Sequence, residues 1–549
     1  MNKKLGSLLL ALVLVLGLCA PAMAAEATEP AKLIILHTND VHGRAVTDLS
    51  EGSFGYAAVA KVKKDLLATG ASVLLLDAGD ASQGMPLVNL NYGESAMAFM
   101  NAVGYDAMAP GNHEFDWGLD VFLQTKEVAE FPILAANIVD KISGEPLFTP
   151  NKVFDMPNGM KVGVFGLDTP EVMTKSNPDK VTGMKIFMED ELYACAQAQV
   201  DELKAAGCDL VVCLGHLGVS DESKPNRSTD VLDKVTGIDL FIDGHSHTEM
   251  DGGEKIGDTL LVSTGSYLNN IGMVTYDGKA LEAKLISAKV DEDALDAGLI
   301  VPVVDEEVNL TINALNDKVQ AELNVPFATT EIDLNGERAP GVRTEETNLG
   351  DFCCDAILWA AQKAVSVPVV AAINNGGGIR ASIEAGEITM NDMKTVFPYG
   401  NQVTVLTVTG AELLEALEAA TCTTPDPIGA FPQVSGMVIT IDTTVPYENG
   451  EMYPDSTYYA PAKPGARVTI DSIGGEPFDP AKNYNIATND FSAAGGDTYY
   501  VFRYANETSG YVTGVALEDA LIDYVTTELG GVVKADAYGQ TQGRITVKQ

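Results

Sequence analysis

Five short apolar runs, separated by stretches with helical spacing, dominate the first half of this 549-residue sequence and limit how it can fold. The runs are LIIL at 33–36, VLLL at 73–76, VGVFGL at 162–167, LVVCL at 210–214 and LFI at 240–242. Continuous apolar runs are typical of strands buried on both faces, and their alternation with helices is typical of an α/β fold. We therefore predict an α/β domain with buried strands over residues 30–300.

A single helix follows this domain and links it to a second one. Apolar residues recur there at spacings of three, four or sums of these: Val304, Val308, Leu315, Val319 and Leu323. Acidic residues at 305–307 suit a helix start and Pro326 stops the helix, so the pattern predicts one amphipathic helix over 304–324. The region 327–549 again mixes strands and helices, with glycine-rich turns at 375–378 and 495–496. The length of the chain also fits two or more domains.

The N-terminus has the pattern of a secretory signal peptide. Two lysines precede an apolar run over 8–18, and Ala22-Met23-Ala24 offers a cleavage site between small residues. The run is shorter than the roughly 20 residues of a transmembrane helix, and the chain has no second one. We predict that residues 1–24 are cleaved and that the protein is exported, to the periplasm, the cell surface or the medium, without a transmembrane segment. Cys19 follows Leu18 rather than a small residue, which favours simple export over a lipoprotein anchor.

The charge of the chain excludes some partners. The formal charge is −42, and it becomes −44 when residues 1–24 and their two lysines are removed. A surface this acidic repels nucleic acid polymers. It also repels phosphorylated small molecules, so metal ions or arginines must make any anion site positive locally. Six cysteines remain after cleavage, and we assign them no chemistry because no C-x-x-C spacing occurs.

Histidines and oxygen ligands follow the apolar runs. The chain has six histidines, and five of them lie just after a run or in the segment PGNHEFDWG at 110–118. The residues concerned are Asp40, His42, Asp80, Asn112, His113, His216, His245 and His247. Ligand-binding groups collect at the carboxyl ends of strands in α/β sheets, so we expect these side chains to meet at one edge. Oxygen and imidazole ligands without thiolate suit two divalent ions such as zinc, manganese, cobalt or iron. For His37 we favour a structural role.

The blocks TNDVHG, DAGD, GNHEFD, GH and GHSH, in this order, resemble those of the calcineurin-like metallophosphatases. More narrowly, they resemble the secreted 5′-nucleotidase family, which includes bacterial periplasmic UDP-sugar hydrolases. The resemblance implies a β-sandwich with flanking helices for the first domain. It also implies two metals bridged by Asp80: one held by Asp40, His42, Asp80 and His247, the other by Asp80, Asn112, His216 and His245.

The same resemblance gives roles to two further residues of PGNHEFDWG. His113 would lie beside the scissile phosphate, where it would stabilise the transition-state charge or protonate the leaving oxygen. Asp116 would orient the imidazole and help to keep it protonated. The alternative for Asp116 is a turn or a helix cap.

The resemblance continues through VRTEETNLGD, INNGGGIR, FPYGN and NDFSAAGGD, and it implies an α/β substrate-binding domain for the second half. Arg343 and Arg380 would bind the terminal phosphate or a carboxylate-like edge of the substrate, since guanidinium forks suit such groups. Asn375 would contact the ribose or phosphate region, and Asp497 the ribose hydroxyls. Tyr399 and Phe491 would sandwich the base. Some relatives have an arginine where this chain has Glu345.

Together these features predict an exported metallophosphohydrolase with two metal ions, which removes phosphate from 5′-nucleotides. Hydrolysis of UDP-sugars or other nucleotide pyrophosphates, or of 2′,3′-cyclic nucleotides, is the alternative within the enzyme class. The alternative outside it is an exported nucleotide-binding protein, which needs no acid for a leaving group and is therefore disfavoured by His113 and Asp116. The sequence leaves the metal, the preferred base and the oligomeric state open.

Overall fold

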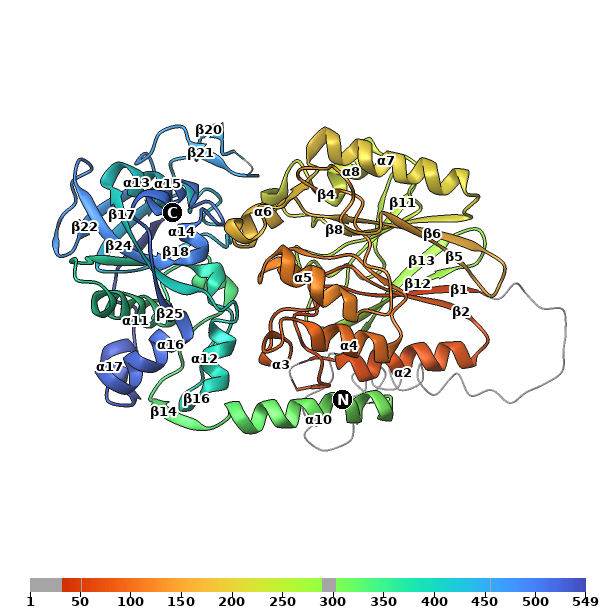
Figure 1. The fold of residues 1–549 in the computed structure, drawn as a ribbon, viewed down its shortest axis with the longest axis horizontal. Helices are drawn as coiled ribbons and strands as arrows, with labels where there is room; N and C mark the ends of the chain where they lie inside the picture. Colours follow the sequence, from red (N-terminus) through yellow and green to blue (C-terminus); the bar gives the residue numbers. More distant parts are fainter. Residues whose placement is uncertain (1–31, 51, 289–302, 455) are drawn as a thin grey trace, which may run out of the picture.

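The computed structural model describes residues 32–50, 52–288, 303–454 and 456–549. The predicted signal peptide, 1–24, lies outside the described residues. Two α/β domains lie side by side, and helix α10 (Glu306–Leu323) runs along the first towards the second (Figure 1).

The first domain is built on two β-sheets that share a core. One sheet has the order β13-β12-β1-β2-β3 and the other the order β10-β11-β9-β8-β6-β5. The strands of the first are β1 (Leu33–Thr38), β2 (Ser72–Asp77), β3 (Ala107–Met108), β12 (Asn270–Tyr276) and β13 (Leu281–Ser287). Those of the second are β5 (Asn151–Asp155), β6 (Lys161–Asp168), β8 (Leu210–His216), β9 (Leu240–Ile242), β10 (Glu254–Ile256) and β11 (Thr259–Val262). The prediction that the five apolar runs form buried strands is confirmed.

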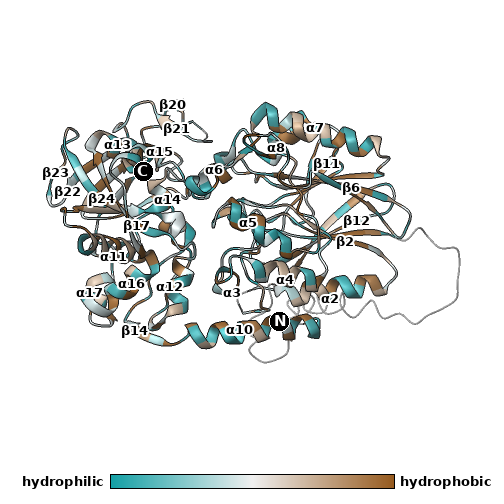
Figure 2. Ribbon diagram, viewed as in Figure 1, coloured by the Kyte–Doolittle hydropathy of each residue, from teal (hydrophilic) through white to brown (hydrophobic). Residues whose placement is uncertain are grey.

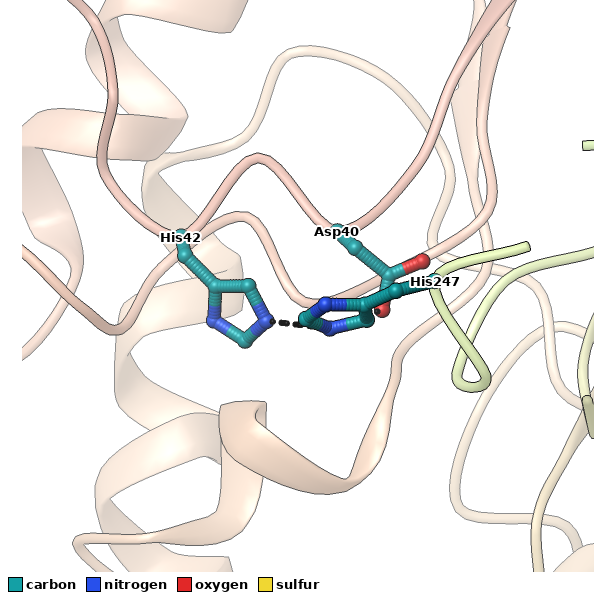
Figure 3. A group of neighbouring side chains, drawn as sticks. All are labelled: Asp40, His42 and His247. Atoms are coloured by element: carbon teal, nitrogen blue, oxygen red, sulfur yellow. Dashed lines mark hydrogen bonds and ion pairs between the residues drawn. The ribbon is translucent and has the colours of Figure 1, made fainter. Parts of the chain in front are cut away.

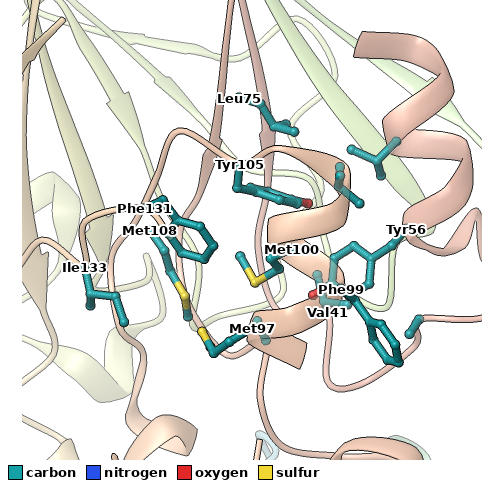
Figure 4. Packing of buried hydrophobic residues seen from close by; sticks show 14 of the residues in the cluster. Val41, Tyr56, Leu75, Met97, Phe99, Met100, Tyr105, Met108, Phe131 and Ile133 are labelled. Carbon is teal, nitrogen blue, oxygen red and sulfur yellow. The ribbon is translucent and has the colours of Figure 1, made fainter. Parts of the chain in front are cut away.

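Alternate side chains of these strands enter different cores, because successive residues of a strand point to opposite faces. Leu33 and Ile35 of β1 pack between the two sheets with Val164 of β6. Ile34 and Leu36 point the other way and pack with helices α2 (Gly55–Ala68) and α4 (Glu94–Val103). Figure 4 shows part of this outer core, including Leu75 of β2 with Met97 and Met100 of α4.

Helices also cover the outer face of the second sheet. Phe165 of β6 packs there with Leu192 and Val200 of α7 (Glu189–Ala205) and with Val231 of α8 (Ser228–Lys234). The first domain is therefore a β-sandwich flanked by helices on both sides, as expected.

The strands that precede the predicted ligands run parallel and end side by side. In the first sheet, Thr38 pairs with Asp77, and Asp77 pairs with Met108. In the second sheet, Asp168 pairs with His216, and Leu214 pairs with Ile242. The loops after these strands therefore emerge together at the edge that faces the second domain.

Short elements fill these loops. They are α3 (Pro86–Asn89), η1 (Asn112–Phe115), α5 (Leu119–Thr125), η2 (Lys126–Val128), β4 (Ile138–Asp140), α6 (Val172–Lys175), η3 (Pro178–Lys180), β7 (Met184–Ile186) and η4 (Asp221–Ser223). Three of them, η1, α6 and η4, carry site residues described below.

Helix α10 lies where the apolar periodicity predicts one. The Asp305 carboxylate accepts the backbone N–H groups of Glu307 and Val308 and so caps the first turn. The hydrophobic side of α10, visible in Figure 2, includes Ile312 and Val319, which belong to the same core as α2 and α4. The helix is thus packed on the first domain rather than being a free linker.

The second domain has a central five-stranded sheet of order β18-β15-β24-β17-β25. Its strands are β15 (Ala371–Asn375), β17 (Gln402–Thr409), β18 (Pro432–Ser435), β24 (Asn483–Asn489) and β25 (Tyr511–Ala516). The smaller sheets contain β14 (Pro326–Thr330), β16 (Gly386–Thr389), β19 (Met437–Asp442), β20 (Asn449–Met452), β21 (Tyr459–Pro461), β22 (Val468–Ile473), β23 (Glu476–Pro477), β26 (Val532–Val533) and β27 (Ile545–Lys548).

Helices cover both faces of this central sheet. Helices α11 (Asn348–Ala364) and α16 (Leu517–Asp523) share one core with it, and α13 (Gly410–Ala419) and α15 (Tyr500–Ser509) share the other. The remaining turns and helices are η5 (Arg338–Val342), η6 (Gly376–Gly378), α12 (Met390–Val396), α14 (Asp490–Ala493), η7 (Tyr524–Glu528) and α17 (Ala535–Tyr538). Strand β15 leads into η6 and β24 leads into α14, so both strands deliver residues to the site.

Neither covalent cross-links nor membrane spans occur in the described part of the chain. All six cysteines there are free. Of the helices in the same residues, none is both long and apolar enough to cross a membrane.

Candidate metal centre and substrate pocket

A pocket between the two domains contains most of the predicted site residues. From the first domain it is lined by Asp80, Asn112, His113, Asp116, His245 and His247. From the second it is lined by Arg343, Asn375, Arg380, Tyr399, Phe491 and Asp497. Asp40, His42 and His216 are buried directly beneath, in contact with these residues. The structure therefore brings together residues that are up to 457 positions apart, Asp40 and Asp497.

Asp40, His42 and His247 form the first ligand group (Figure 3). The Nε2 atoms of His42 and His247 are 3.2 Å apart, and His247 Nε2 lies 3.4 Å from Asp40 Oδ1. His42 Nδ1 lies 3.2 Å from the carbonyl oxygen of Gln83, which leaves Nε2 facing the group. The three side chains thus present one oxygen and two nitrogens to the same point.

Asp80 connects this group to a second one, which contains His216. Asp80 Oδ2 lies 3.8 Å from His42 Nε2 and 3.2 Å from His216 Nε2. Its other oxygen accepts the backbone N–H of His113 at 2.8 Å. Asp40, Asp80 and His216 also form a compact group of ligand atoms. The position of Asp80 between the two histidines fits a bridging ligand.

Two buried polar atoms test whether these residues fit metal ions. His216 Nδ1 lies 2.6 Å from the carbonyl oxygen of Ala78, whereas His216 Nε2, although 3.2 Å from Asp80 Oδ2, is buried without a hydrogen bond to any described residue. Asn112 Oδ1 is likewise buried and has no hydrogen-bond partner in the described part of the chain. Buried polar atoms are normally satisfied, and both unpartnered atoms are good ligands for a divalent ion. The donor set therefore fits the two divalent ions expected from the sequence.

The ligand loops have strained backbones. Six of the ten non-glycine residues with positive φ in the described part are predicted site residues: Asp40, His42, Asp80, His245, His247 and Asp497. Such conformations are unfavourable for residues with a Cβ, and they cluster at functional sites. Glycines allow the loops to approach closely, because a Cβ on Gly111 would lie 2.4 Å from Asp80 Oδ1 and one on Gly244 would lie 2.7 Å from His216 Nδ1.

His113 and Asp116 form a hydrogen-bonded pair in η1 and just after it. His113 Nδ1 lies 2.7 Å from Asp116 Oδ2. Burial disfavours the charged imidazole, but the carboxylates of Asp116 and Asp80 outweigh burial and raise the pKa of His113. The remaining ring nitrogen is within reach of the group formed by His42 and Asp80, so geometry alone also allows His113 to be a ligand. The side chain of Asp116 contacts the imidazole, which favours an orienting role over capping.

Glu114, the residue after His113, holds two ligand loops together, and the sequence analysis did not identify it. Its carboxylate accepts backbone N–H groups from Asp80, Ala81 and Ser82 at 2.8–3.0 Å, and from Gly111 at 2.7 Å. It therefore fixes the loop after β2 to the loop after β3. An acid inside GNHEFD was visible in the sequence, but nothing local indicated these partners.

Three arginines of the second domain line the pocket. Arg343 and Arg380 were predicted, whereas Arg338 was not. Within the described residues none of the three forms an ion pair. Burial, together with the charges of Arg338 and Arg380, lowers the pKa of Arg343 to about 9. Three neighbouring guanidinium groups without ion pairs among the described residues make a favourable site for an anion.

The predicted contacts for base and ribose surround the same pocket. Asn375 Nδ2 donates to Asp497 Oδ2 at 3.0 Å. Phe491 packs against Gly496, where a Cβ would lie 2.4 Å from the ring. Tyr399 stacks on His113 with 5.6 Å between the ring centroids, a contact that the sequence did not predict.

A polar network joins the domains at the edge of the pocket, and the sequence analysis did not predict it. Lys175 Nζ of α6 lies 2.6 Å from Glu222 Oε1 and 3.5 Å from Asp497 Oδ1. The Tyr458 hydroxyl of the second domain donates to Glu222 at 2.6 Å. Thus Asp497, predicted to bind ribose, also contacts the first domain.

His37 lies apart from this site. It is buried in β1 against Gly272 of β12, and burial lowers its pKa to about 3. This position agrees with the structural role favoured from the sequence.

Comparisons with known proteins agree with this geometry. The model of the calcineurin-like phosphoesterase family matches residues 33–249, and that of the 5′-nucleotidase C-terminal domain matches residues 325–504. A 5′-nucleotidase of Vibrio cholerae is 31% identical over 546 residues, which cover 92% of each chain. Protein UshA of Escherichia coli is 31% identical over 520 residues, 87% of this chain and 88% of UshA. The structure of a 5′-nucleotidase precursor from Thermus thermophilus has a TM-score of 0.76 and 28% identity, and covers 94% of this chain and 99% of that one.

Asp80 lies between the two ligand groups, and this position generates a prediction about metal content. We expect protein loaded with Mn²⁺ or Zn²⁺ and then desalted to retain about two ions per chain, as a two-metal site requires. Asp80→Ala should lower the occupancy of both positions, because its carboxylate faces both groups. His113→Ala, the control, should retain both ions. Elemental analysis of folded protein measures this, and full metal content in Asp80→Ala would contradict it.

Proposed function

The chain belongs to the 5′-nucleotidase family and is a metallophosphoesterase, and we propose that it removes the phosphate group of nucleoside 5′-monophosphates outside the cytoplasm. The observation that carries the proposal is the composition of the interdomain pocket. The first domain lines this pocket with buried carboxylates and imidazoles, and the second lines it with three arginines that form no ion pair among the described residues. His113 lines the same pocket, within reach of His42 and Asp80.

We assign Asp40, His42, Asp80 and His247 to one metal and Asp80, Asn112, His216 and His245 to the other. When bound, two such ions stabilise the charge that develops on phosphorus and lower the pKa of a water molecule. Arg343 and Arg380 are the proposed phosphate-binding residues, and Arg338 adds a third positive charge to the same wall.

His113 is the proposed group that acts on the leaving oxygen. Its Nδ1 is bonded to Asp116, so Nε2 is the nitrogen that faces the pocket. The carboxylates of Asp116 and Asp80 raise the pKa of His113, which favours the protonated form needed to stabilise or protonate a leaving alkoxide. Asp116 therefore orients the ring and supports its charge.

The second domain is the proposed source of nucleoside recognition. Phe491 and Tyr399 both line the pocket and are the residues proposed to bind the base between their rings. Asp497, supported by Asn375, presents oxygen acceptors to the ribose hydroxyls. The predicted signal peptide supports the extracytoplasmic location.

The proposed substrate is tested by measuring phosphate release from a panel of compounds. The panel contains nucleoside 5′-monophosphates, UDP-glucose, 2′,3′-cyclic nucleotides and a small aryl phosphate, each with Mn²⁺, Co²⁺ or Zn²⁺ added to chelated protein. We expect the highest kcat/KM for a 5′-monophosphate and no turnover without metal. A higher kcat/KM for UDP-glucose or a cyclic nucleotide would assign the alternative activity. Tight nucleotide binding without turnover would assign a binding protein.

The pairing of His113 with Asp116 generates a kinetic prediction. His113→Ala should lower kcat by roughly 10²–10⁴-fold, the usual contribution of a positioned acid or base. Asp116→Asn should lower kcat less, because the amide oxygen still accepts a hydrogen bond from Nδ1. Steady-state kinetics of the metal-loaded variants measure both effects. An unchanged rate for Asp116→Asn would return that residue to a capping role, and loss of a metal ion in His113→Ala would make the histidine a ligand.

The two aromatic residues generate a prediction about substrate selectivity. Base–aromatic stacking contributes roughly 1–3 kcal/mol per base, so replacing both Tyr399 and Phe491 by alanine should raise KM for a 5′-nucleotide strongly. Hydrolysis of the aryl phosphate should change little, because that substrate has no base. The thermal transition of the double variant provides the folding control. Equal losses on both substrates would show that these rings support the fold or His113, which Tyr399 contacts, rather than the base.

A further inference from the structure

Glu171 is a buried acid that lines the pocket and contacts a predicted metal ligand. It lies in the loop after β6, the one apolar run for which the sequence analysis assigned no site residue. Its exposed fraction is 1%, and its Oε2 lies 2.7 Å from His245 Nε2. Its other oxygen, Oε1, is buried without a hydrogen-bond partner among the residues that the structure describes. A carboxylate with so little exposure needs a specific partner, and His245 Nε2 provides one.

The backbone holds Glu171 firmly in this position. Its N–H donates to Thr169 Oγ1 at 3.2 Å, and its carbonyl oxygen accepts the backbone N–H groups of Thr174 and Lys175 in α6. The preceding strand β6 pairs in parallel with β8, so Asp168 lies beside His216. The end of β6 and the start of α6 therefore place the carboxylate beside the second ligand group.

His245 is held from the other side by its own backbone. Its N–H lies 3.1 Å from both carboxylate oxygens of Asp40, and its φ is +71°. The ring stands edge to face on that of His216, with 5.2 Å between centroids. His245 belongs to none of the compact ligand groups found in the described residues, so its ability to bind a metal depends on how the ring is oriented.

The hydrogen bond to Glu171 decides which nitrogen of His245 is available. A carboxylate accepts hydrogen bonds, so Nε2 carries the hydrogen and Nδ1 carries the lone pair of the neutral ring. His216 shows the opposite arrangement, since its Nδ1 faces the Ala78 carbonyl and its Nε2 lies 3.2 Å from Asp80 Oδ2. Two histidines that follow neighbouring strands thus offer different nitrogens.

We propose that Glu171 is a positioning residue that orients His245 so that Nδ1, not Nε2, binds the second metal ion. The proposal rests on the metal-dependent function proposed above. Carboxylate partners of metal-binding histidines fix the tautomer and the ring orientation, and their loss typically weakens metal binding by about 10–100-fold.

Cobalt titration of chelated, full-length protein tests the proposal without measuring activity. Wild-type protein should bind two Co²⁺ ions with visible absorption bands. Glu171→Ala should weaken one of the two by about 10–100-fold, whereas Glu171→Gln should weaken it less because its amide oxygen still accepts a hydrogen bond. Glu222→Gln, another acid that lines this pocket, is the control and should bind Co²⁺ as the wild type does. Wild-type affinities in Glu171→Ala would overturn the proposal.

A double-mutant comparison separates positioning from a general loss of structure. In a His245→Ala background, adding Glu171→Ala should not weaken cobalt binding further, because Glu171 acts through that ring. If Glu171→Ala weakens cobalt binding as much in the His245→Ala background as it does in the wild type, the positioning role is overturned. Binding of fewer than two ions by the wild type would contradict the proposed function itself. Binding of two ions by the wild type, with the same affinities in Glu171→Ala, would contradict only the role of Glu171. The two failures are therefore distinguishable.

A measurement on the unmodified protein covers the case in which the variants do not fold. In Zn²⁺-loaded protein with ¹⁵N-labelled histidine, NMR correlations of the ring nitrogens should show His245 bound through Nδ1 and His216 bound through Nε2. Coordination of His245 through Nε2, or a free His245 ring in protein with two bound ions, would overturn the proposal.

Discussion

The burial of Asp80 is the constraint around which the rest of the structure is arranged. A carboxylate removed from water is costly unless charges or hydrogen-bond donors surround it. One carboxylate oxygen of Asp80 lies near the imidazole nitrogens of His42 and His216, and the other accepts a hydrogen bond from the backbone N–H of His113. Because these partners come from different loops, those loops must converge, and they do so with backbone conformations that only a well-supported structure maintains.

The two sheets of the first domain provide that support. Parallel strands in matched register end side by side, so their loops begin close together before any side chain is considered. Glu114 then binds the backbone of two of these loops, and glycines such as Gly111 and Gly244 remove the Cβ atoms that would otherwise separate them. The site is therefore rigid on the side of the metal ligands. This rigidity suits chemistry in which groups must be placed before the charge develops.

The second domain contributes a complementary surface. Its arginines supply positive charge in a protein of formal charge −42, and they face the pocket without ion pairs within the described residues. Helix α10 is packed on the first domain, while Lys175 and Glu222 of that domain contact Asp497 and Tyr458 of the second. The residue proposed to bind ribose is therefore shared between the domains. The residues proposed to recognise the nucleoside and those proposed to bind the phosphate therefore line one pocket.

The sequence by itself determined five strands of the first domain and most of the residues that could carry chemistry. Strand formation depends on local apolar runs, and all five runs form strands where expected. Most ligand candidates could be predicted because they follow such a run, whereas Asn112 lies in the segment PGNHEFDWG after the short strand β3. The same strand-end rule applied to β6 would have indicated Glu171 and Lys175. Only the tertiary structure decided which side chains meet. Glu171 and His245 are 74 residues apart, and Arg338, Glu222 and Tyr458 reach the pocket through loops with no local signature. Sheet order and domain packing create these contacts, and both arise from interactions between distant segments that no local pattern records.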